Sequence, residues 1–366
     1  MTNSASHRSG DSFSKRHRQP NQTLRSGILK ALDQLPELEN GALIEEIFET
    51  LVRMTQQEAE RLDWKILSRS LLDMEGGFQA FYPHRHTRKV TVFGSARTPS
   101  DQPEYQMAVE FSRRIAQEGF MVMTGAGGGI MQAGNEGAGR DRSFGLNIQL
   151  PFEQGANPAI RGDDKLVDFR YFFTRKLFFL KESDAIALFP GGFGTQDEAF
   201  ETLTLIQTGK ATPLPIVLID RPGGDYWKSW DFYLRNRLLD RGLISPDDTS
   251  LYHLTESIDD AIASIEDFYR MYHSSRYVEG QLVLRLKAPL CAGGIDQLND
   301  EFQDILTKGI IREVSAFPAE QDDETASLPR LALYFNQRNQ GRLHQMIRRL
   351  GKLGTFCDAE QHPEQK

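Results

Sequence analysis

The most informative segment of the chain is a glycine-rich turn at Pro190–Glu198, which reads Pro-Gly-Gly-Phe-Gly-Thr-Gln-Asp-Glu. It follows the short apolar run Ala185–Phe189, an expected β-strand, and leads into a helix predicted from Thr195 to Thr208. Such a strand, turn and helix direct free backbone N–H groups and the positive end of the helix dipole at one point. The glycines permit close approach of the backbone, and Thr195 adds a hydroxyl donor. The pattern therefore predicts a phosphate site.

A carboxylate, Glu198, lies one helical turn beyond the start of that predicted helix. Hydrolysis of an N-glycosidic bond develops positive charge on the ribose ring, and a carboxylate beneath the ring can stabilise that charge or orient the attacking water. The spacing Thr195-x-x-Glu198 is also that of a capping box, which stabilises a helix start without any chemistry. The sequence alone leaves both interpretations of Glu198 open.

The second charged candidate is the pair Arg175-Lys176. We expect a strand at Phe169–Phe173 and a helix at Arg175–Glu182, directly before the strand that enters the glycine turn. Because consecutive strands of a doubly wound sheet tend to lie close, this order predicts that Arg175 comes near Glu198. A guanidinium there could bind phosphate or steady a leaving base, whereas a solvated surface pair is the alternative.

A second glycine loop, Gly125–Gly129, follows the predicted strand Phe120–Met123. It resembles a dinucleotide-binding fingerprint only loosely, because Ile130 replaces a glycine and no acidic residue ends the next strand. The pattern disfavours NAD and leaves either a nucleotide contact or tight packing between strand and helix. Ser95, at the end of the first strand, belongs to the same rim.

These candidates lie in a region where short apolar runs alternate with helical patterns. The alternation predicts an α/β protein with a Rossmann-like, doubly wound parallel sheet, whose ligands bind at the carboxyl ends of the strands. The other expected elements are strands at Val90–Phe93, Phe144–Leu150 and Ile216–Ile219 and helices at Glu104–Glu118, Ile130–Ala138, Trp227–Asp240 and Ser257–His273.

The composition changes along the chain predict five parts. They are a disordered basic tail at 1–26, a helical extension at 27–88, the nucleotide-binding catalytic domain at 89–275, a small α+β domain at 276–354, and a tail at 355–366. A targeting segment is the alternative for the basic tail. The acidic stretch Glu320–Glu324 of the α+β domain is expected to be a solvated loop.

Overall composition excludes several classes of protein. The net charge of −8 provides no basic excess for a nucleic-acid partner, and no apolar run is long enough to span a membrane. The two cysteines, Cys291 and Cys357, indicate neither a disulfide framework nor a thiolate zinc site, which fits a cytoplasmic protein. His84-x-His86 lacks the further ligands that a metal site would need.

Taken together, Thr174-Arg175-Lys176, the strand Ala185–Phe189 and the turn Pro190–Glu198 resemble the LONELY GUY family of nucleotide phosphoribohydrolases, often mislabelled lysine decarboxylases. The resemblance covers roughly Lys89–Ser274. It implies that the chain hydrolyses a nucleoside 5′-monophosphate, either AMP or a cytokinin riboside 5′-monophosphate, to free base and ribose 5-phosphate. It also implies a homodimer that needs no cofactor and no metal.

The same resemblance implies the roles of individual residues. Arg175 and Glu198 correspond to the catalytic pair. The residues expected to bind substrate are Ser95, Gly127, Gly128, Met131, Glu153, Lys176, Gly191, Gly192, Phe193, Gly194 and Thr195. Phe172-Phe173 stands where short members carry Met-His, which leaves the preferred base open. A nucleotide-sensing or carrier protein with the same fold is the alternative function, and the α+β domain is a possible site for a regulatory ligand.

Overall fold

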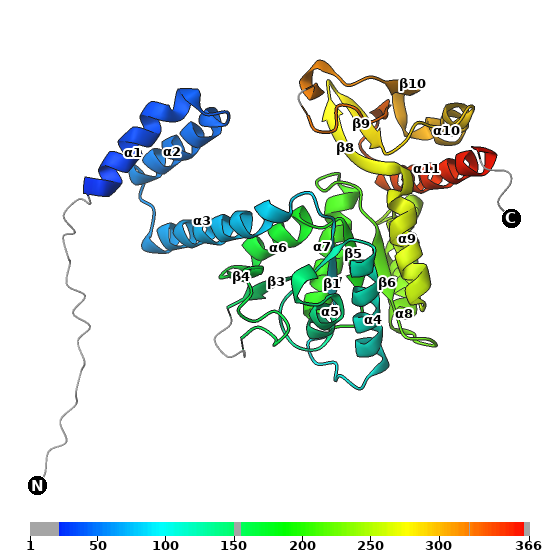
Figure 1. Ribbon diagram of the computed structural model, residues 1–366, viewed down its shortest axis with the longest axis horizontal. Coiled ribbons are helices and arrows are strands. Elements are labelled where there is room, and N and C mark those ends of the chain that lie inside the picture. The colour runs from blue at the N-terminus through cyan, green and yellow to red at the C-terminus, as the bar shows by residue number, and fades with distance from the viewer. Residues whose placement is uncertain (1–21, 150–154, 322, 362–366) are drawn as a thin grey trace, which may run out of the picture. The chain divides into compact units, whose positions relative to one another are not determined.

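The computed structural model describes residues 22–149, 155–321 and 323–361, in two compact units that divide between Ser68 and Arg69. In the first unit, helices α1 (Gln22–Gln34) and α2 (Gly41–Thr55) are joined by the short 3-10 turn Leu35–Glu37 (Figure 1). A third helix, α3 (Arg61–Phe81), begins in the first unit and continues into the second. The helical pattern read in the N-terminal part of the sequence is therefore present.

The second unit is built on a sheet of seven parallel strands in the order β4-β3-β2-β1-β5-β6-β7 (Figure 1). The strands are β1 (Lys89–Phe93), β2 (Met121–Thr124), β3 (Ser143–Ile148), β4 (Leu166–Phe169), β5 (Ala185–Leu188), β6 (Ile216–Ile219) and β7 (Tyr252–Thr255). The chain winds outward from β1 in one direction and then from β5 in the other. The predicted doubly wound α/β fold is confirmed, and the point between β1 and β5 is where such folds bind ligands.

Helices cover both faces of this sheet. One apolar core joins the sheet to α4 (Pro103–Gln117), α5 (Ile130–Ala138) and α9 (Ile258–Met271). The other joins it to the end of α3 and to α6 (Phe172–Lys181), α7 (Phe193–Gln207) and α8 (Tyr226–Tyr233). Because both faces are buried, the central strands β5 and β6 are continuous apolar runs rather than alternating ones.

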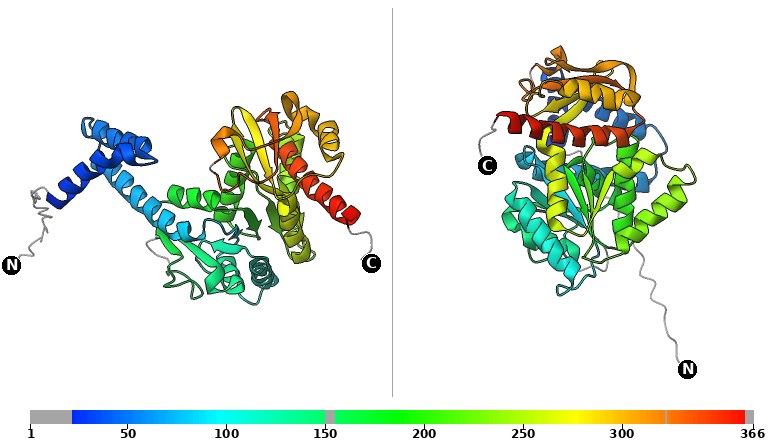
Figure 2. Two further views of the ribbon diagram at one scale, coloured as in Figure 1. Left: turned by 45° about the horizontal axis from the view of Figure 1, so that its top comes forward. Right: turned by 90° about the vertical axis from the view of Figure 1, so that its right-hand side faces the viewer.

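A separate four-stranded antiparallel sheet follows, in the order β10-β11-β9-β8. Figure 2 draws this part of the chain in yellow to orange, apart from the green and cyan strands of the parallel sheet. Its strands are β8 (Tyr272–Val278), β9 (Gln281–Leu286), β10 (Leu306–Val314) and β11 (Arg330–Phe335), accompanied by helices α10 (Gly294–Phe302) and α11 (Gln340–Gln361). Helix α11 packs against α9 and the end of α7. This small layer adjoins the amino ends of the parallel strands, because Arg88, just before β1, donates to the carbonyl of His273 in β8 at 3.1 Å.

Several element boundaries differ from the sequence prediction. Strands β7 and β8 were not predicted, and the helix expected to reach His273 ends at Met271. The helix expected at Trp227–Asp240 is α8 followed by a π-helical segment, Leu234–Leu239. The strand β8 reads Tyr-His-Ser-Ser-Arg-Tyr-Val and lacks the alternation that marks a strand, so its pairing with β9 determines its conformation.

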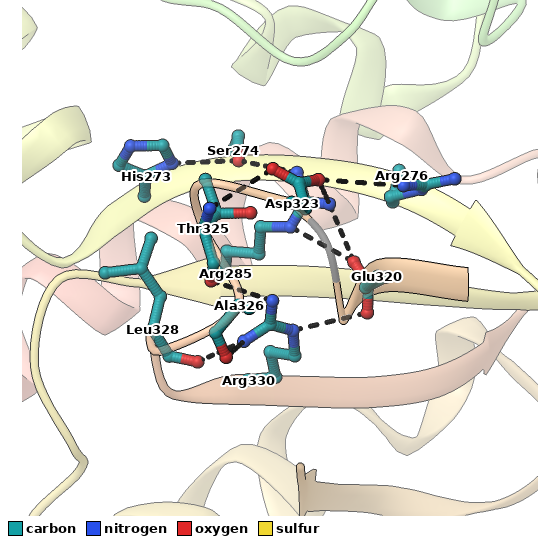
Figure 3. A network of polar contacts seen from close by, with 10 residues as sticks. All are labelled: His273, Ser274, Arg276, Arg285, Glu320, Asp323, Thr325, Ala326, Leu328 and Arg330. Atoms are coloured by element: carbon teal, nitrogen blue, oxygen red, sulfur yellow. Dashed lines mark hydrogen bonds and ion pairs between the residues drawn. The ribbon is translucent and has the colours of Figure 1, made fainter. Parts of the chain in front are cut away.

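Glu320, at the start of the acidic stretch of the C-terminal layer, is structural rather than solvated (Figure 3). Glu320 is fully buried, accepting from Arg285 Nη2 at 2.7 Å and from Arg330 Nε at 3.2 Å. Arg285 Nη2 also lies 2.9 Å from Asp323 Oδ2. The expectation of a solvated loop was wrong for Glu320, because a buried carboxylate persists only when it is paired.

None of the helices within the described residues is long and apolar enough to cross a membrane.

Candidate functional site

Three turns meet at the carboxyl edge of the parallel sheet, at the ends of β1, β2 and β5. The amide of Ser95, after β1, donates to the carbonyl of Pro190 at 3.1 Å, and the carbonyl of Ser95 accepts from the amide of Ile130 at 3.0 Å. The β1 turn is thus held between the glycine turn on one side and the β2 loop on the other. This places Ser95, Gly191 and the Gly125–Gly129 loop on one rim, as the sequence predicted.

The glycines of this rim divide into two kinds. A Cβ on Gly191 would lie 2.1 Å from Thr195 Oγ1 and 2.9 Å from the amide of Ser95, and one on Gly129 would lie 2.2 Å from the carbonyl of Ser95. These two are required by packing. Gly192 and Gly194, in contrast, have no atom within 4 Å of such a Cβ and face open space. The open pair leaves their backbone accessible at the start of α7, where an anion can be bound.

Helix α7 begins earlier than predicted, which changes the interpretation of Glu198. Gly192 is the N-cap residue and Phe193 is the first helical residue, so that Thr195 and Glu198 both lie within the helix. The capping-box interpretation of Thr195-x-x-Glu198 is therefore wrong, because Thr195 does not occupy the N-cap position. Both side chains are nonetheless buried, and Glu198 is only 8% exposed.

Burial dominates the electrostatics of Glu198. It raises the pKa of this carboxyl from 4.5 to about 7, although the positive charges of Lys176 and Arg175 pull the pKa in the opposite direction. The nearest approach to a cation is 3.8 Å, between Glu198 Oε1 and Lys176 Nζ. A carboxyl group with a pKa near neutrality can gain or lose a proton under ordinary conditions, which is what acid–base chemistry requires.

Lys176 links α6 to α7. Its ammonium group contacts Asp197 at 2.9 Å and forms an ion pair with Glu201, besides lying near Glu198. Burial works to lower the pKa of Lys176, but the hydrogen bonds to Glu201 and Asp197 outweigh it and the pKa lies above its ordinary value. Lys176 is therefore a permanent cation whose position is set by acidic side chains of α7.

Arg175 comes near Glu198 by a different route from the one predicted. Strand β4 lies at the edge of the sheet, separated from β5 by β3, β2 and β1, so the argument from neighbouring strands was wrong. Helix α6 starts at Phe172, three positions before Arg175, and carries the side chain back to the rim. There, Arg175 Nη1 lies 3.8 Å from the position that a Cβ on Gly125 would occupy. The positive charge of Arg175 acts to lower the pKa of Glu198.

The β2 loop is held by a buried polar network that sequence reasoning missed. Ala126 has a positive φ of 60°, an uncommon conformation for a residue with a side chain. Its amide donates to Thr124 Oγ1 at 3.0 Å, and its carbonyl accepts from the amide of Asn157 at 2.8 Å. Asn157 Nδ2 also donates to the carbonyl of Gly127 at 3.0 Å and to Asn135 Oδ1 at 3.0 Å.

The remaining predicted residues are placed as follows. Met131 lies over the β2 loop, since a Cβ on Gly127 would be 2.6 Å from its Cε; Gly128 lies against the β1 turn, where a Cβ would be 3.4 Å from the carbonyl of Ala96. Phe193, at the start of α7, is 96% exposed. Glu153 lies outside the described residues. Across 22–149, 155–321 and 323–361, no group of three or more His, Cys, Asp or Glu side chains could hold a metal ion.

Comparisons with known proteins cover this part of the chain. The family described as "Possible lysine decarboxylase" matches residues 123–265. A cytokinin riboside 5′-monophosphate phosphoribohydrolase of Mycobacterium tuberculosis is 28% identical over 174 residues, which cover 46% of this chain and 88% of that protein. The probable cytokinin riboside 5′-monophosphate phosphoribohydrolase LOGL5 of Oryza sativa subsp. japonica is 25% identical over 194 residues, which cover 51% of this chain and 75% of that protein. Among solved structures, the molybdenum cofactor carrier protein of Chlamydomonas reinhardtii matches with a TM-score of 0.35 and 22% identity, covering 49% of this chain and 96% of that one.

Proposed function

We propose that this chain, whose parallel-sheet domain is related to the LONELY GUY nucleotide phosphoribohydrolases, hydrolyses the N-glycosidic bond of a nucleoside 5′-monophosphate. The products are the free base and ribose 5-phosphate. The observation that carries the proposal is the position of Glu198: a buried carboxyl with a pKa near 7 lies beside two cations and one turn inside a glycine turn suited to phosphate.

The phosphate group is assigned to the start of α7. Gly192 and Gly194 leave their backbone open there, and the helix behind them is 15 residues long, enough to present a full dipole end. With the phosphate fixed at this turn, the ribose extends over Glu198 and toward the rim formed by Ser95, Gly127, Gly128 and Met131. Glu153, Gly191, Phe193 and Thr195 complete the proposed set of substrate contacts.

The proposed reaction breaks the bond between C1′ of the ribose and the base nitrogen. The base leaves with the bonding electron pair and takes a proton from solvent, to which Glu198 later returns the proton it removes from the attacking water, while positive charge develops on the ribose ring. The Glu198 carboxylate stabilises this charge and accepts a proton from the water whose oxygen bonds to C1′. The guanidinium of Arg175 binds the substrate opposite this carboxylate, at the leaving base or the phosphate.

The proposed substrates are AMP and N6-substituted adenosine 5′-monophosphates, the second in line with the names of the two relatives. Release of an N6-substituted base would give the chain a role in cytokinin formation. Because a charged phosphate does not cross a membrane unaided, the enzyme must share a compartment with its nucleotide, and we place it in the cytoplasm.

A homodimer is the proposed assembly. Helices α6 and α7 expose five large apolar side chains close to the site, a pattern typical of a surface that another chain covers. They are Phe172 at 50%, Phe173 at 53%, Leu177 at 46%, Phe193 at 96% and Phe200 at 38% exposure. Light scattering of the purified chain would decide this: a dimer that Leu177→Asp converts to a monomer is expected, and a monomeric wild type would contradict it.

The test of the function compares substrates that differ in one group. Purified protein is incubated with AMP, with the N6-isopentenyl analogue and with adenosine, and free base and ribose 5-phosphate are quantified. The proposal predicts base release from at least one nucleotide and none from adenosine, which lacks the phosphate. If nucleotides bind but are recovered intact, the chain is a nucleotide sensor or carrier.

A further inference from the structure

We propose that Asp73, in α3, is the positioning residue that fixes the first turn of α6 and, with it, Arg175. Both helices meet within the second compact unit, residues 69–366. The kinetic consequence of this inference rests on the proposed hydrolase function, whereas its structural part rests only on the contacts between α3 and α6.

A single oxygen of Asp73 accepts three hydrogen bonds from the start of α6. Asp73 Oδ2 lies 3.0 Å from the amide of Arg170, 3.2 Å from the amide of Tyr171 and 2.8 Å from Thr174 Oγ1. Asp73 is 8% exposed, and Thr174 is fully buried. Asp73 is thus the acceptor for the two amides, whereas the Thr174 hydroxyl also lies 2.8 Å from the carbonyl oxygen of Tyr171.

This contact anchors the start of α6, which has no side-chain cap of its own. The first N–H groups of a helix have no partner inside the helix, and a side chain at the N-cap position usually satisfies one of them. The N-cap residue here is Tyr171, whose side chain makes no such bond. Asp73 instead accepts from the amide of Tyr171, the N-cap residue itself, and from the hydroxyl of Thr174, and its charge lies favourably at the positive end of the helix dipole.

The capped turn carries Arg175 directly. Arg175 follows Thr174 in the chain, and its amide donates to the carbonyl of Tyr171 at 3.3 Å. Two of the donors to Asp73 are thus on the residues that hold the Arg175 backbone in place. Close packing reinforces the contact one turn further on, since a Cβ on Gly77 of α3 would lie 2.3 Å from Phe178 Cζ of α6. Displacement of α3 from α6 would therefore shift the guanidinium relative to Glu198.

The test compares Asp73→Ala and Asp73→Asn with the full-length wild type. Because all three donors converge on one oxygen, the amide oxygen of asparagine can accept them, whereas alanine accepts none. We expect Asp73→Ala to accelerate amide hydrogen exchange at residues 172–176 about tenfold and to lower kcat/KM for AMP by about 10–100-fold. Asp73→Asn is expected to remain close to wild type in both measurements.

Asp248→Ala is the matched control. Asp248 is also a buried carboxylate, 9% exposed, that accepts from a backbone amide, that of Ser245, and from Gln207 at the far end of α7. The substitution Asp248→Ala should lower thermal stability without changing amide hydrogen exchange at residues 172–176 or the kcat/KM of the folded protein. The proposal is overturned if Asp73→Ala leaves exchange in α6 unchanged, if Asp248→Ala reproduces its effects, or if asparagine does not restore them. If the wild type hydrolyses no nucleotide, the proposed function fails, and the exchange measurement still decides the role of Asp73.

Discussion

Two buried glutamates of this protein have opposite electrostatic environments. Glu320, in the antiparallel layer, is fully buried between Arg285 and Arg330, with donor distances of 2.7 and 3.2 Å. Glu198, at the edge of the parallel sheet, is 8% exposed and comes no closer than 3.8 Å to its neighbouring Lys176. Burial acts to raise the pKa of both.

The outcome differs because only one of them is paired at close range. The hydrogen bond from Arg285 and the charges of both arginines hold the pKa of Glu320 below its ordinary value, in spite of burial. Burial prevails at Glu198 and raises its pKa to about 7. The difference teaches that burial of a charge does not by itself indicate a functional residue, whereas burial with incomplete pairing at an open rim makes a residue a candidate for function.

The largest effect is expected on removing the paired glutamate. Glu320→Ala leaves Arg330 buried without a carboxylate and Arg285 with only the partly exposed Asp323, and it should lower the free energy of unfolding by about 3–5 kcal/mol. Urea denaturation of the full chain would measure it. Base release per folded molecule should be unchanged, and a stability loss below 1 kcal/mol would mean that the network contributes little.

Removing the incompletely paired glutamate, Glu198, should raise the free energy of unfolding instead of lowering it. The folded chain keeps a proton on Glu198 that the unfolded chain releases between pH 4.5 and about 7, so this carboxyl costs stability increasingly as the pH rises through that window. Glu198→Gln is therefore expected to stabilise the protein by about 2–4 kcal/mol at pH 8 relative to wild type. The difference should vanish near pH 4.5. Equal stability at pH 8 would show that the pKa of Glu198 is not raised.

The same carboxyl predicts the pH dependence of the reaction. If the carboxylate form is active, kcat/KM should fall about tenfold between pH 8 and pH 6, because one pH unit below a pKa of about 7 leaves about a tenth of the carboxylate. The second pKa of the substrate phosphate lies near 6, so the substrate also titrates in this range. The control is the affinity of Glu198→Gln for AMP over the same pH range, because this variant lacks the Glu198 carboxyl. A flat profile would exclude Glu198 as the titrating base.

The smallest effect on the free energy of unfolding is expected at Asp323, the partly exposed carboxylate beside Glu320. Asp323 also contacts Arg285, at 2.9 Å, but its side chain is 31% exposed. Asp323→Asn should therefore cost only about 0.5–1 kcal/mol in urea denaturation. A loss as large as that of Glu320→Ala would mean that the two carboxylates act as one unit.

Local patterns were sufficient to predict much of the fold. Strands that end in glycine turns, such as β2 and β5, combine a continuous apolar run with a residue type that stops it, so their presence and the doubly wound architecture followed from the sequence. The resemblance to the LONELY GUY family, stated from the Arg175-Lys176 pair and the Pro190–Glu198 turn, is confirmed by the family match and the two curated relatives. The roles of individual site residues and the five-part domain division stay predictions.

What the sequence could not provide depends on contacts between distant segments. Arg175 reaches the rim because α6 returns across the sheet, not because β4 and β5 are neighbours. Asp73 and Asn157 have no motif around them, and their roles arise from partners 97 to 101 positions away for Asp73 and 22 to 31 positions away for Asn157. No periodicity in the chain encodes such pairings.

The most direct test of the central claim is a single-turnover assay with enzyme in excess over AMP, comparing wild type with Glu198→Gln and quantifying adenine and ribose 5-phosphate. Denaturation curves of both proteins establish that the variant is folded. The account predicts equal amounts of the two products from wild type and a rate at least about 100-fold lower from the variant. Equal rates would contradict the assignment of Glu198 as the catalytic carboxylate.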